Sequence, residues 1–392
     1  MDALTTPSNW QRVRLGDVGK PCMCKRVMKH QTTRYGEIPF YKIGTFGNTA
    51  DAFISKKLFL EYKTKYSFPK KGDILISASG TIGRAVIYDG KPAYFQDSNI
   101  VWIDNDETLV KNDFLFYAYS NIKWNTEHTT ILRLYNDNFK NTLIPLPPLN
   151  EQIAIANILS GLDRYLYSLD ALILKKESVK KALSFELLSQ RKRLKGFNQA
   201  WQRVRLGDIC EFGNGGAYET LIVENGDFKL ISLNSIDIDG NLKNTMKRVN
   251  FYDNSLKQDD IVMVLSDVAH GDFLGLCAVI PNNDYVLNQR MGRLRKKNDC
   301  INILFLRLYI NANQKYFKMQ GQGSSQLNLS KKAIEDFEIP LPPLNEQIAI
   351  ANILSALDSE IISLKNKKRQ FENIKKALNH DLMSAKIRVL KK

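Results

Sequence analysis

Side chains suited to reading DNA bases cluster between residues 288 and 293. Asn288 and Gln289 carry amides, which form paired hydrogen bonds with adenine edges. Arg290 and Arg293 carry guanidinium groups, which form them with guanine. A solvated strand and turn explains any single one of these residues equally well. The chemistry that the segment favours is recognition of bases.

A second candidate segment, SASGTIGR at 77–84, follows a predicted strand in the first half of the chain. Its small residues and its arginine are suited to phosphate contacts through backbone NH groups and the guanidinium of Arg84. A third candidate is the polar loop 321–326, which aligns without a gap with residues 126–131. The two loops occupy equivalent positions but differ in their residues, as expected of two domains that recognise different DNA sequences.

From these three places we expect DNA contacts, and the expected set combines both halves of the chain. Thr129 and Thr130 belong to the aligned loop. The contact residues that we single out are Ser79, Thr81, Arg84, Arg133, Tyr135, Asn136, Asn288, Gln289, Arg290, Arg293, Ser324 and Gln326.

Catalytic signatures are missing from the sequence. It has no phosphate-binding loop of the Gly-x-x-x-x-Gly-Lys type, no His-Glu-x-x-His helix and no Asn/Asp-Pro-Pro-aromatic motif. Acid-x-Lys steps at 61–63 and 89–91 are common on protein surfaces, and the four histidines stand singly. Cys22 and Cys24 lack a second cysteine pair, so we expect reduced thiols and no metal site. We therefore expect a protein that is not an enzyme.

One block of sequence occurs twice. IPLPPLNEQIAIANILS stands at 144–160 and again at 339–355, and WQRVRLGD opens at Trp10 and at Trp201. The stretches between these blocks, 18–143 and 209–338, scarcely match. The chain is a tandem duplication with a shared scaffold and divergent readers.

Each repeated block predicts a long helix. Prolines at 145, 147 and 148 impose an extended lead-in, Asn150 stands where an N-cap should be, and Gly196 is expected to end the first helix. Apolar residues recur at alternating spacings of four and three, which is a coiled-coil pattern. In the first copy the pattern comprises Ile155, Leu159, Leu162, Leu166, Leu169, Ile173, Val179, Leu183 and Leu187. In the second it comprises Ile350, Leu354, Leu357, Ile361, Leu364, Phe371, Ile374, Leu378 and Leu382.

The simplest way to bury both apolar stripes is to pair the two helices with each other. A helix of about 40 residues spans about 60 Å, too long for one compact domain to cover. Antiparallel pairing would relate the two halves by a pseudo-two-fold axis, the arrangement with which dimeric DNA readers match inverted half-sites. The alternative is that the helices merely brace two unrelated domains.

Both globular regions mix α and β structure. Apolar runs at 73–77 and 260–264 predict buried strands, and amphipathic helices are expected at 113–120 and 303–310. The expected fold class is α/β (α+β), with mixed sheets. The expected domains are 1–145 and 197–340 as globular readers, with helices at 146–196 and 341–392.

Charge favours a polyanionic partner. The 392 residues carry a net charge of +15, and the pI is near 9.4. Residues 1–150 hold 20 basic and 14 acidic side chains, whereas residues 197–345 hold 17 of each. A second reader would therefore have to sort its cations onto one face. No apolar stretch approaches a membrane span and no signal peptide is present, so we expect a cytoplasmic protein.

The duplicated Pro-Leu-Pro-Pro-Leu-x-Glu-Gln block, the Trp-x-x-x-x-Leu-Gly-Asp openings and the Lys-Gly-Asp-Ile-Leu strand at 71–75 resemble the specificity subunit of type I restriction-modification enzymes. The resemblance covers nearly the whole chain. It implies two target-recognition domains, each reading half of a bipartite DNA sequence, joined by two helices in an antiparallel coiled coil. The second copy departs at 258–262, where QDDIV replaces KGDIL.

The resemblance also implies partners and a division of labour. The helices would act as a ruler for the spacer and would dock two methyltransferase subunits, which carry S-adenosylmethionine and flip one adenine in each strand. Restriction and translocase subunits would supply ATP- and Mg²⁺-dependent cleavage, so no cofactor is expected in this chain. Residues expected in the coiled coil and in partner binding are Leu159, Leu162, Leu166, Leu169, Leu354, Leu357, Ile361 and Leu364.

The rival interpretation is a coiled-coil protein-interaction scaffold without sequence-specific DNA binding. In that case the globular domains bind proteins. The two interpretations differ in salt dependence, because binding through several phosphates weakens steeply with added salt. A hidden nuclease is a third interpretation, which the missing motifs disfavour.

Overall fold

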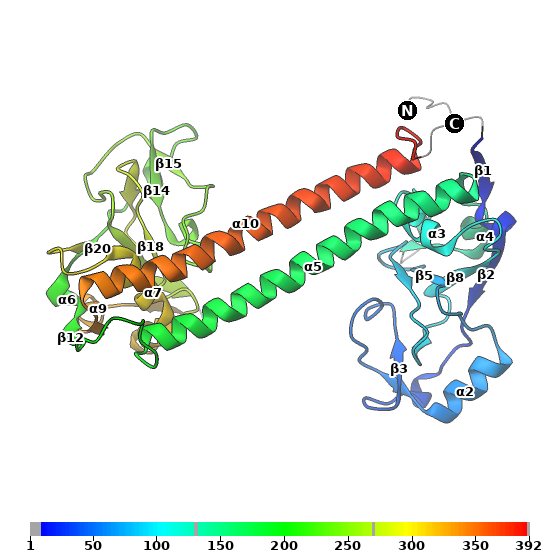
Figure 1. Cartoon of the computed structure of the whole chain (residues 1–392), viewed down its shortest axis with the longest axis horizontal. Coiled ribbons are helices and arrows are strands. Elements are labelled where there is room, and N and C mark those ends of the chain that lie inside the picture. Colours follow the sequence, from blue (N-terminus) through cyan, green and yellow to red (C-terminus); the bar gives the residue numbers. More distant parts are fainter. Residues whose placement is uncertain (1–8, 129–131, 269–270, 390–392) are drawn as a thin grey trace. The chain divides into compact units, whose positions relative to one another are not determined.

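The computed structural model describes residues 9–128, 132–268 and 271–389, and it divides into two compact units (Figure 1). The first unit comprises Met1–Ala171 and Asn366–Lys392, and the second comprises Leu172–Lys365. Each unit therefore contains one globular region together with halves of both long helices. The expected domains are cut differently by this division, because the long helices belong to both units.

The first unit contains a small ribbon and two main sheets. β1 (Gln11–Arg14) pairs with β11 (Leu143–Leu146) in the ribbon, and β9 (Glu127–His128) pairs with β10 (Leu132–Arg133). The first main sheet has the order β2 (Gly19–Met23), β8 (Ile100–Asn105), β5 (Ile74–Ser77), β6 (Ala85–Ile87), and the second has the order β4 (Phe53–Ile54), β3 (Ile38–Tyr41), β7 (Tyr94–Phe95). Short helices are α1 (Leu15–Val18), α2 (Lys56–Lys65), α3 (Asn112–Tyr119) and α4 (Asn136–Lys140).

The second unit repeats the ribbon and the strand orders of the two main sheets with different residues. β12 (Gln202–Arg205) pairs with β22 (Glu338–Leu341), and β17 (Ser266–Val268) pairs with β21 (Gln326–Asn328). The main sheets have the orders β13 (Cys210–Asn214), β20 (Met291–Lys296), β16 (Ile261–Val264), β18 (Cys277–Val279) and β15 (Arg248–Val249), β14 (Phe228–Ile231), β19 (Tyr285–Leu287). Short helices are α6 (Leu206–Ile209), α7 (Ile303–Ala312), α8 (Gln314–Gln320) and α9 (Lys331–Glu335).

The predicted apolar strands are β5 and β16, and both are buried along their whole length. Successive side chains of a strand point to opposite faces, so each strand serves two cores. In β5, Ile74 and Ile76 pack in the core that also holds α3, whereas Leu75 packs in the aromatic core around β3 and β7. Burial on both faces explains the uninterrupted apolar letters.

The long helices are α5 (Leu149–Leu188) and α10 (Leu344–Met383), and they run antiparallel within each unit. Residues near the start of α5 pair with residues near the end of α10, and later residues of α5 pair with earlier residues of α10. In the first unit these pairs are Asp163–Lys375, Tyr165–Phe371 and Asp170–Lys368, and in the second they are Lys176–Glu360, Glu177–Lys365 and Lys180–Asp358. The expected antiparallel pairing is confirmed in both units.

Three details of the expected helices are wrong. α5 begins at Leu149, so Asn150 lies inside its first turn, and it ends at Leu188, eight residues before Gly196. Val179 and Ile374 are 41% and 50% exposed and lie outside the helix interface. The heptad spacing brings Lys180 and Lys375 to the facing positions instead, where each forms an ion pair with an aspartate of the other helix.

α10 is also long and apolar enough to cross a membrane by length and composition, with a mean hydropathy of 1.3 over its best window. Only 28% of that window is buried in the described structure. Its buried side chains include Ile350, Ala351 and Leu354, which lie in the main core of the second unit, and near the end of the helix Leu382 lies in a core of the first.

A buried glutamate ties the start of each long helix to the rest of its unit. Glu151 accepts hydrogen bonds from the indole of Trp10 at 3.0 Å and from the guanidinium of Arg388 at 2.7 and 3.0 Å. In the second unit Glu346 accepts from Trp201 at 3.0 Å and from Arg193 at 2.6 and 3.2 Å. The arginine follows the long helix of the other copy, so each unit is closed by a residue from the neighbouring repeat.

Removing this arginine should destabilise the unit strongly, because it leaves a buried carboxylate without its charge partner. We predict that Arg193→Met lowers the free energy of unfolding by about 3 kcal/mol. The neighbouring Lys192 forms only a 3.7 Å pair on an exposed side chain, so Lys192→Met should cost less than about 1 kcal/mol. Urea unfolding of the full chain, followed by far-UV circular dichroism, compares the two; equal losses would contradict this account.

Candidate nucleic-acid interface

Each unit has one polar edge, formed by the residues that directly follow an inner strand of its four-stranded sheet, β5 in the first unit and β16 in the second. Beyond β5, Ala78 accepts the backbone NH of Leu134 at 2.9 Å, and Ser79 bridges to Arg133. Beyond β16, Leu265 accepts the NH of Leu329 at 2.9 Å, and β17 then pairs with β21. The edge is thus built twice from the same backbone geometry.

The side chains on the first edge include one that sequence reasoning missed. Ser79 donates a hydrogen bond to Asn99 at 2.8 Å, and the carbonyl of Asn99 accepts the NH of Ala78 at 2.8 Å. Arg133 is exposed beside them. Asn99 follows a positive-φ serine and lies twenty residues from Ser79, so no local pattern marks it. Ser79, Asn99 and Arg133 therefore form one polar group.

The turn after Ser79 holds the other predicted residues of this segment. Thr81 is exposed, and Arg84 donates from Nη1 to the carbonyl of Phe46 at 3.0 Å. Gly83 has φ +84°, and a Cβ there would stand 2.1 Å from the indole nitrogen of Trp124. The indole therefore packs directly on the turn. A hollow of about 260 Å³ opens between Thr81, Arg84 and Phe46.

The second edge brings together residues of three segments. Ser266 is hydrogen-bonded to Asn328 at 2.5 Å, and Gln326 pairs in register with Val268. The carbonyl of Arg290 accepts the NH of Leu265 at 3.1 Å, which places exposed Arg290 beside this pair. Arg290 thus occupies the position that Asn99 occupies in the first unit. Ser266 and Asn328 are further residues that the sequence reasoning missed.

The remaining predicted residues have different surroundings. Asn288 is buried, and its side chain accepts the NH of Gln289. Arg293 lies within β20, where its guanidinium pairs with Glu211 at 2.6 Å and donates to the carbonyl of Ser255 at 3.2 Å. These contacts fit a structural role. The other predicted contacts are exposed and without such ties: Gln289, Ser324, Tyr135 and Asn136.

The aligned loops 126–131 and 321–326 both lead into these edges. Gln322 pairs with Asn328, and Gly323 has φ +126°, which turns the second loop back on itself. In the first loop, β9 pairs with β10 across the segment, while residues 129–131, including Thr129 and Thr130, lie outside the described part of the chain. The pairing of Glu127 with Arg133 in the first unit thus corresponds to the pairing of Gln322 with Asn328 in the second.

The expected coiled-coil residues lie along the paired faces of α5 and α10. Four of them are buried, namely Leu159, Leu169, Leu354 and Ile361. The others are half-buried, namely Leu162, Leu166, Leu357 and Leu364. A different set of apolar residues on these helices is exposed, and it includes Leu149, Ile153, Ile158 and their counterparts Leu344, Ile348 and Ile353.

Comparisons with known proteins agree along the whole chain. The family described as "Type I restriction modification DNA specificity domain" matches residues 7–176 and 198–373. A Haemophilus influenzae protein that carries the name of a type I restriction enzyme specificity subunit is 65% identical over 148 residues, which is 38% of each chain. The Type I restriction enzyme MjaVIII specificity subunit of Methanocaldococcus jannaschii is 29% identical over 99% of this chain and 95% of its own.

A solved structure shows the same fold. The crystal structure of a type I restriction-modification system S subunit from M. genitalium superposes with a TM-score of 0.65 at 20% identity, over 98% of both chains. The family matches twice, and each match includes the polar edge of one unit and the start of a long helix. The repeats found in the sequence are therefore two copies of this domain. The chain belongs to the type I restriction-modification DNA specificity family.

Proposed function

We propose that the chain is the subunit that determines which DNA sequence a type I restriction-modification complex recognises. Two independent recognition domains, in the regions 1–145 and 197–340, would each read one half of the target. The observation that supports this most is the repeated polar edge: one backbone frame carries Ser79, Asn99 and Arg133 in the first unit and Ser266, Arg290 and Asn328 in the second. A frame that is kept while its side chains change suits recognition of two different half-sites.

The chain itself supplies recognition and its partners supply catalysis. Its sequence lacks the motifs for binding ATP or a methyl donor. Among the described residues, no three His, Cys, Asp or Glu side chains are grouped to hold a metal. S-adenosylmethionine, ATP and Mg²⁺ would act on methyltransferase and translocase subunits in the cytoplasm. Methylation of one adenine on each strand would then follow from two readers on one duplex.

The surface for two methyltransferase subunits is proposed from the exposed part of the repeated block. Ile153 and Ile348 are 45% and 40% exposed, yet they stand in letter-identical segments where packing does not require them. Exposed apolar side chains that both copies retain are typical of a protein contact made twice. We place one methyltransferase subunit on the start of each long helix.

The reader assignment predicts separate effects on the two half-sites. Selection of bound duplexes from a random library by the complex should yield a split motif. Arg290→Ala should cost about 1–3 kcal/mol and relax one base position in one half, because a bidentate contact is lost. Arg133→Ala should relax a position only in the other half, so each variant is the control for its counterpart. A uniform loss over all sequences would contradict base reading by the altered arginine.

The docking assignment predicts stoichiometry. Ile153→Asp should remove one methyltransferase subunit and the Ile153→Asp, Ile348→Asp double variant should remove both, because a charge in an apolar contact is left desolvated and unpaired. Leu174→Asp is the control, since Leu174 is 65% exposed and the second copy has Arg369 there. Native mass spectrometry counts the subunits. A double variant that still holds two would place the contact elsewhere.

A further inference from the structure

One surface hollow recurs at the same place in both units. Each hollow lies between the two-stranded ribbon and the C-terminal end of a short helix, α4 in the first unit and α9 in the second, and each has a volume of about 670 Å³. Both are distinct from the reader edges. Because the backbone is the same, differences in side chains show what each hollow can bind.

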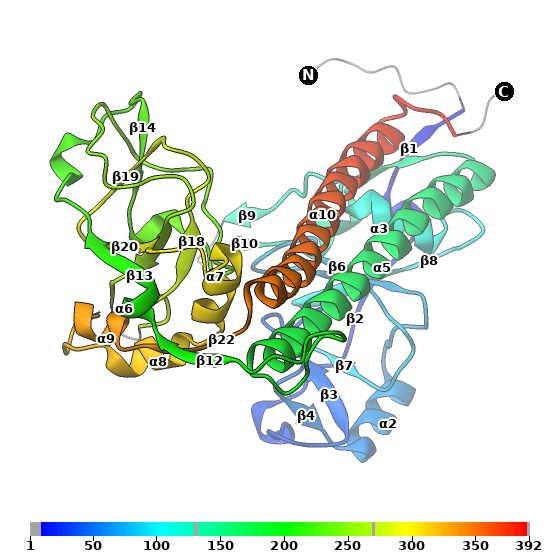
Figure 2. The same cartoon turned by 60° about the vertical axis from the view of Figure 1, so that its left-hand side comes forward.

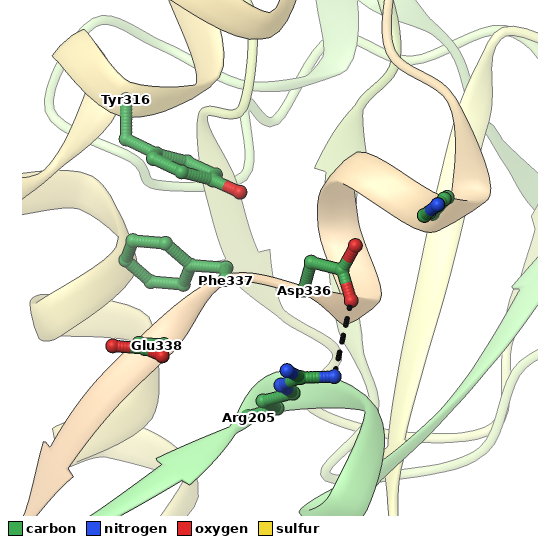
Figure 3. Close-up of a pocket in the computed structure, with 6 residues that line it drawn as sticks. Arg205, Tyr316, Asp336, Phe337 and Glu338 are labelled. Carbon is green, nitrogen blue, oxygen red and sulfur yellow. Dashed lines mark ion pairs between the residues drawn. The ribbon is translucent and has the colours of Figure 1, made fainter.

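The second-unit hollow is neutralised by its own acids (Figure 3). Arg205 pairs with Asp336 at 3.7 Å, and the adjacent Arg203 pairs with Glu338 at 3.1 Å. The carboxylates also act on the ring nearby, since burial together with Asp336 and Glu338 raises the pKa of Tyr316. The charged side chains of the lining are Arg205 and Lys332 against Asp336 and Glu338, so their formal charges sum to zero.

The first-unit hollow has Arg12 in its lining and no aspartate or glutamate among its lining residues. Arg12 and Arg14 occupy the register positions of Arg203 and Arg205, opposite Pro145 and Leu143. Leu143 stands where the second copy has Glu338, and Asn141 follows α4 as Asp336 follows α9. Within residues 9–128, 132–268 and 271–389, neither Arg12 nor Arg14 has an ion pair.

Further bases and amides complete this lining. Lys123 comes from the segment after α3 and His380 from α10, and neither has an ion-pair partner in the described part of the chain. Lys140 contacts Gly16 where the second unit has Glu335 against Gly207. Amides of Asn121, Asn125 and Asn141 line the same hollow. Acids close along the chain are Asp17, which accepts the backbone NH of Arg14 at 3.1 Å, Glu127, Asp137 in the first turn of α4, and Asp381, which pairs with Lys386; none of them is among the lining residues.

We propose that the first-unit hollow binds a backbone phosphate of duplex DNA, and that the second-unit hollow does not. Guanidinium, ammonium and amide donors without a carboxylate among them are the donors that protein–DNA complexes use for phosphates. Residues 121–126 run from the hollow straight into β9 of the reader edge, which connects the two surfaces. The electrostatic contribution to DNA affinity is therefore larger in the first half of the chain than in the second.

An acidic protein surface is the other anion that such donors could meet, and the difference between the two units favours DNA over it. A protein partner bound twice would meet the same chemistry in both units, as it does at Ile153 and Ile348. The two hollows instead differ at Asn141/Asp336 and Leu143/Glu338. The difference matches the charge of the two readers, which is net positive in the first region and zero in the second.

The test is the salt dependence of duplex binding by the complex, and it rests on the proposed function. Asn141→Asp with Leu143→Glu gives the first hollow the acids of the second without deleting a cation. It should reduce the magnitude of the slope of log affinity against log salt by about 0.9, the contribution of one phosphate contact. The reciprocal change, Asp336→Asn with Glu338→Leu, should increase the magnitude of the slope. Arg12→Ala should reduce this magnitude and Arg203→Ala should leave it unchanged.

The outcomes separate the alternatives. Unchanged slopes in every variant, with the split motif still selected, would overturn the phosphate site and leave the readers standing. Loss of a methyltransferase subunit from Arg12→Ala with an unchanged slope would overturn it in favour of an acidic protein partner. Failure of the unaltered complex to bind DNA would remove the proposed function and this inference together. Thermal unfolding of each variant checks that the unit remains folded.

Discussion

The structure depends on a carboxylate buried at the first turn of each long helix. Glu151 and Glu346 accept hydrogen bonds from a tryptophan at the start of their own repeat and from an arginine after the helix of the other. The positive end of the helix dipole favours the same charge. The adjacent glutamines, Gln152 and Gln347, each accept one backbone NH and donate to two carbonyls. Strand, helix and tail are therefore fixed by two neighbouring side chains.

This constraint explains which letters the duplication has retained. Each unit closes only when four features are present: the tryptophan, the proline block, the Glu-Gln pair and the arginine. All four are identical in the two copies. The polar edges are held by backbone hydrogen bonds, such as those of Ala78 and Leu265. Backbone bonds of this kind form whichever side chains the residues carry. The side chains on these edges can therefore differ between the copies without a change in the backbone frame, as the proposed recognition of two half-sites requires.

Sequence periodicity predicted the long helices, their antiparallel pairing and the buried strands, because apolar spacing records burial directly. It failed at Val179 and Ile374, since the facing positions there belong to lysines whose partners lie on the other helix. It also failed at the helix end, because α5 ends at Leu188, shortly before Gln190 with φ +63°, and not at Gly196. The sequence predicts the apolar face of a helix more reliably than the residues at which the helix ends.

The reader residues show the same limit. Ser79 was visible because it follows an apolar strand, but Asn99 and Asn328 join the site only through pairing between distant segments. Likewise no local pattern shows that Arg293 is engaged by Glu211, eighty-two residues away. Side chains that act together here are brought together by strand pairing, and strand pairing leaves no trace in the spacing of single letters.

The most direct measurement is a map of methylated adenines across the genome of cells that express this chain with its methyltransferase, compared with cells that lack only this chain. The account predicts a two-part motif with a fixed spacer, methylated on both strands, that disappears with the chain. Identical maps in the two kinds of cell, with the complex assembled and active, would contradict it.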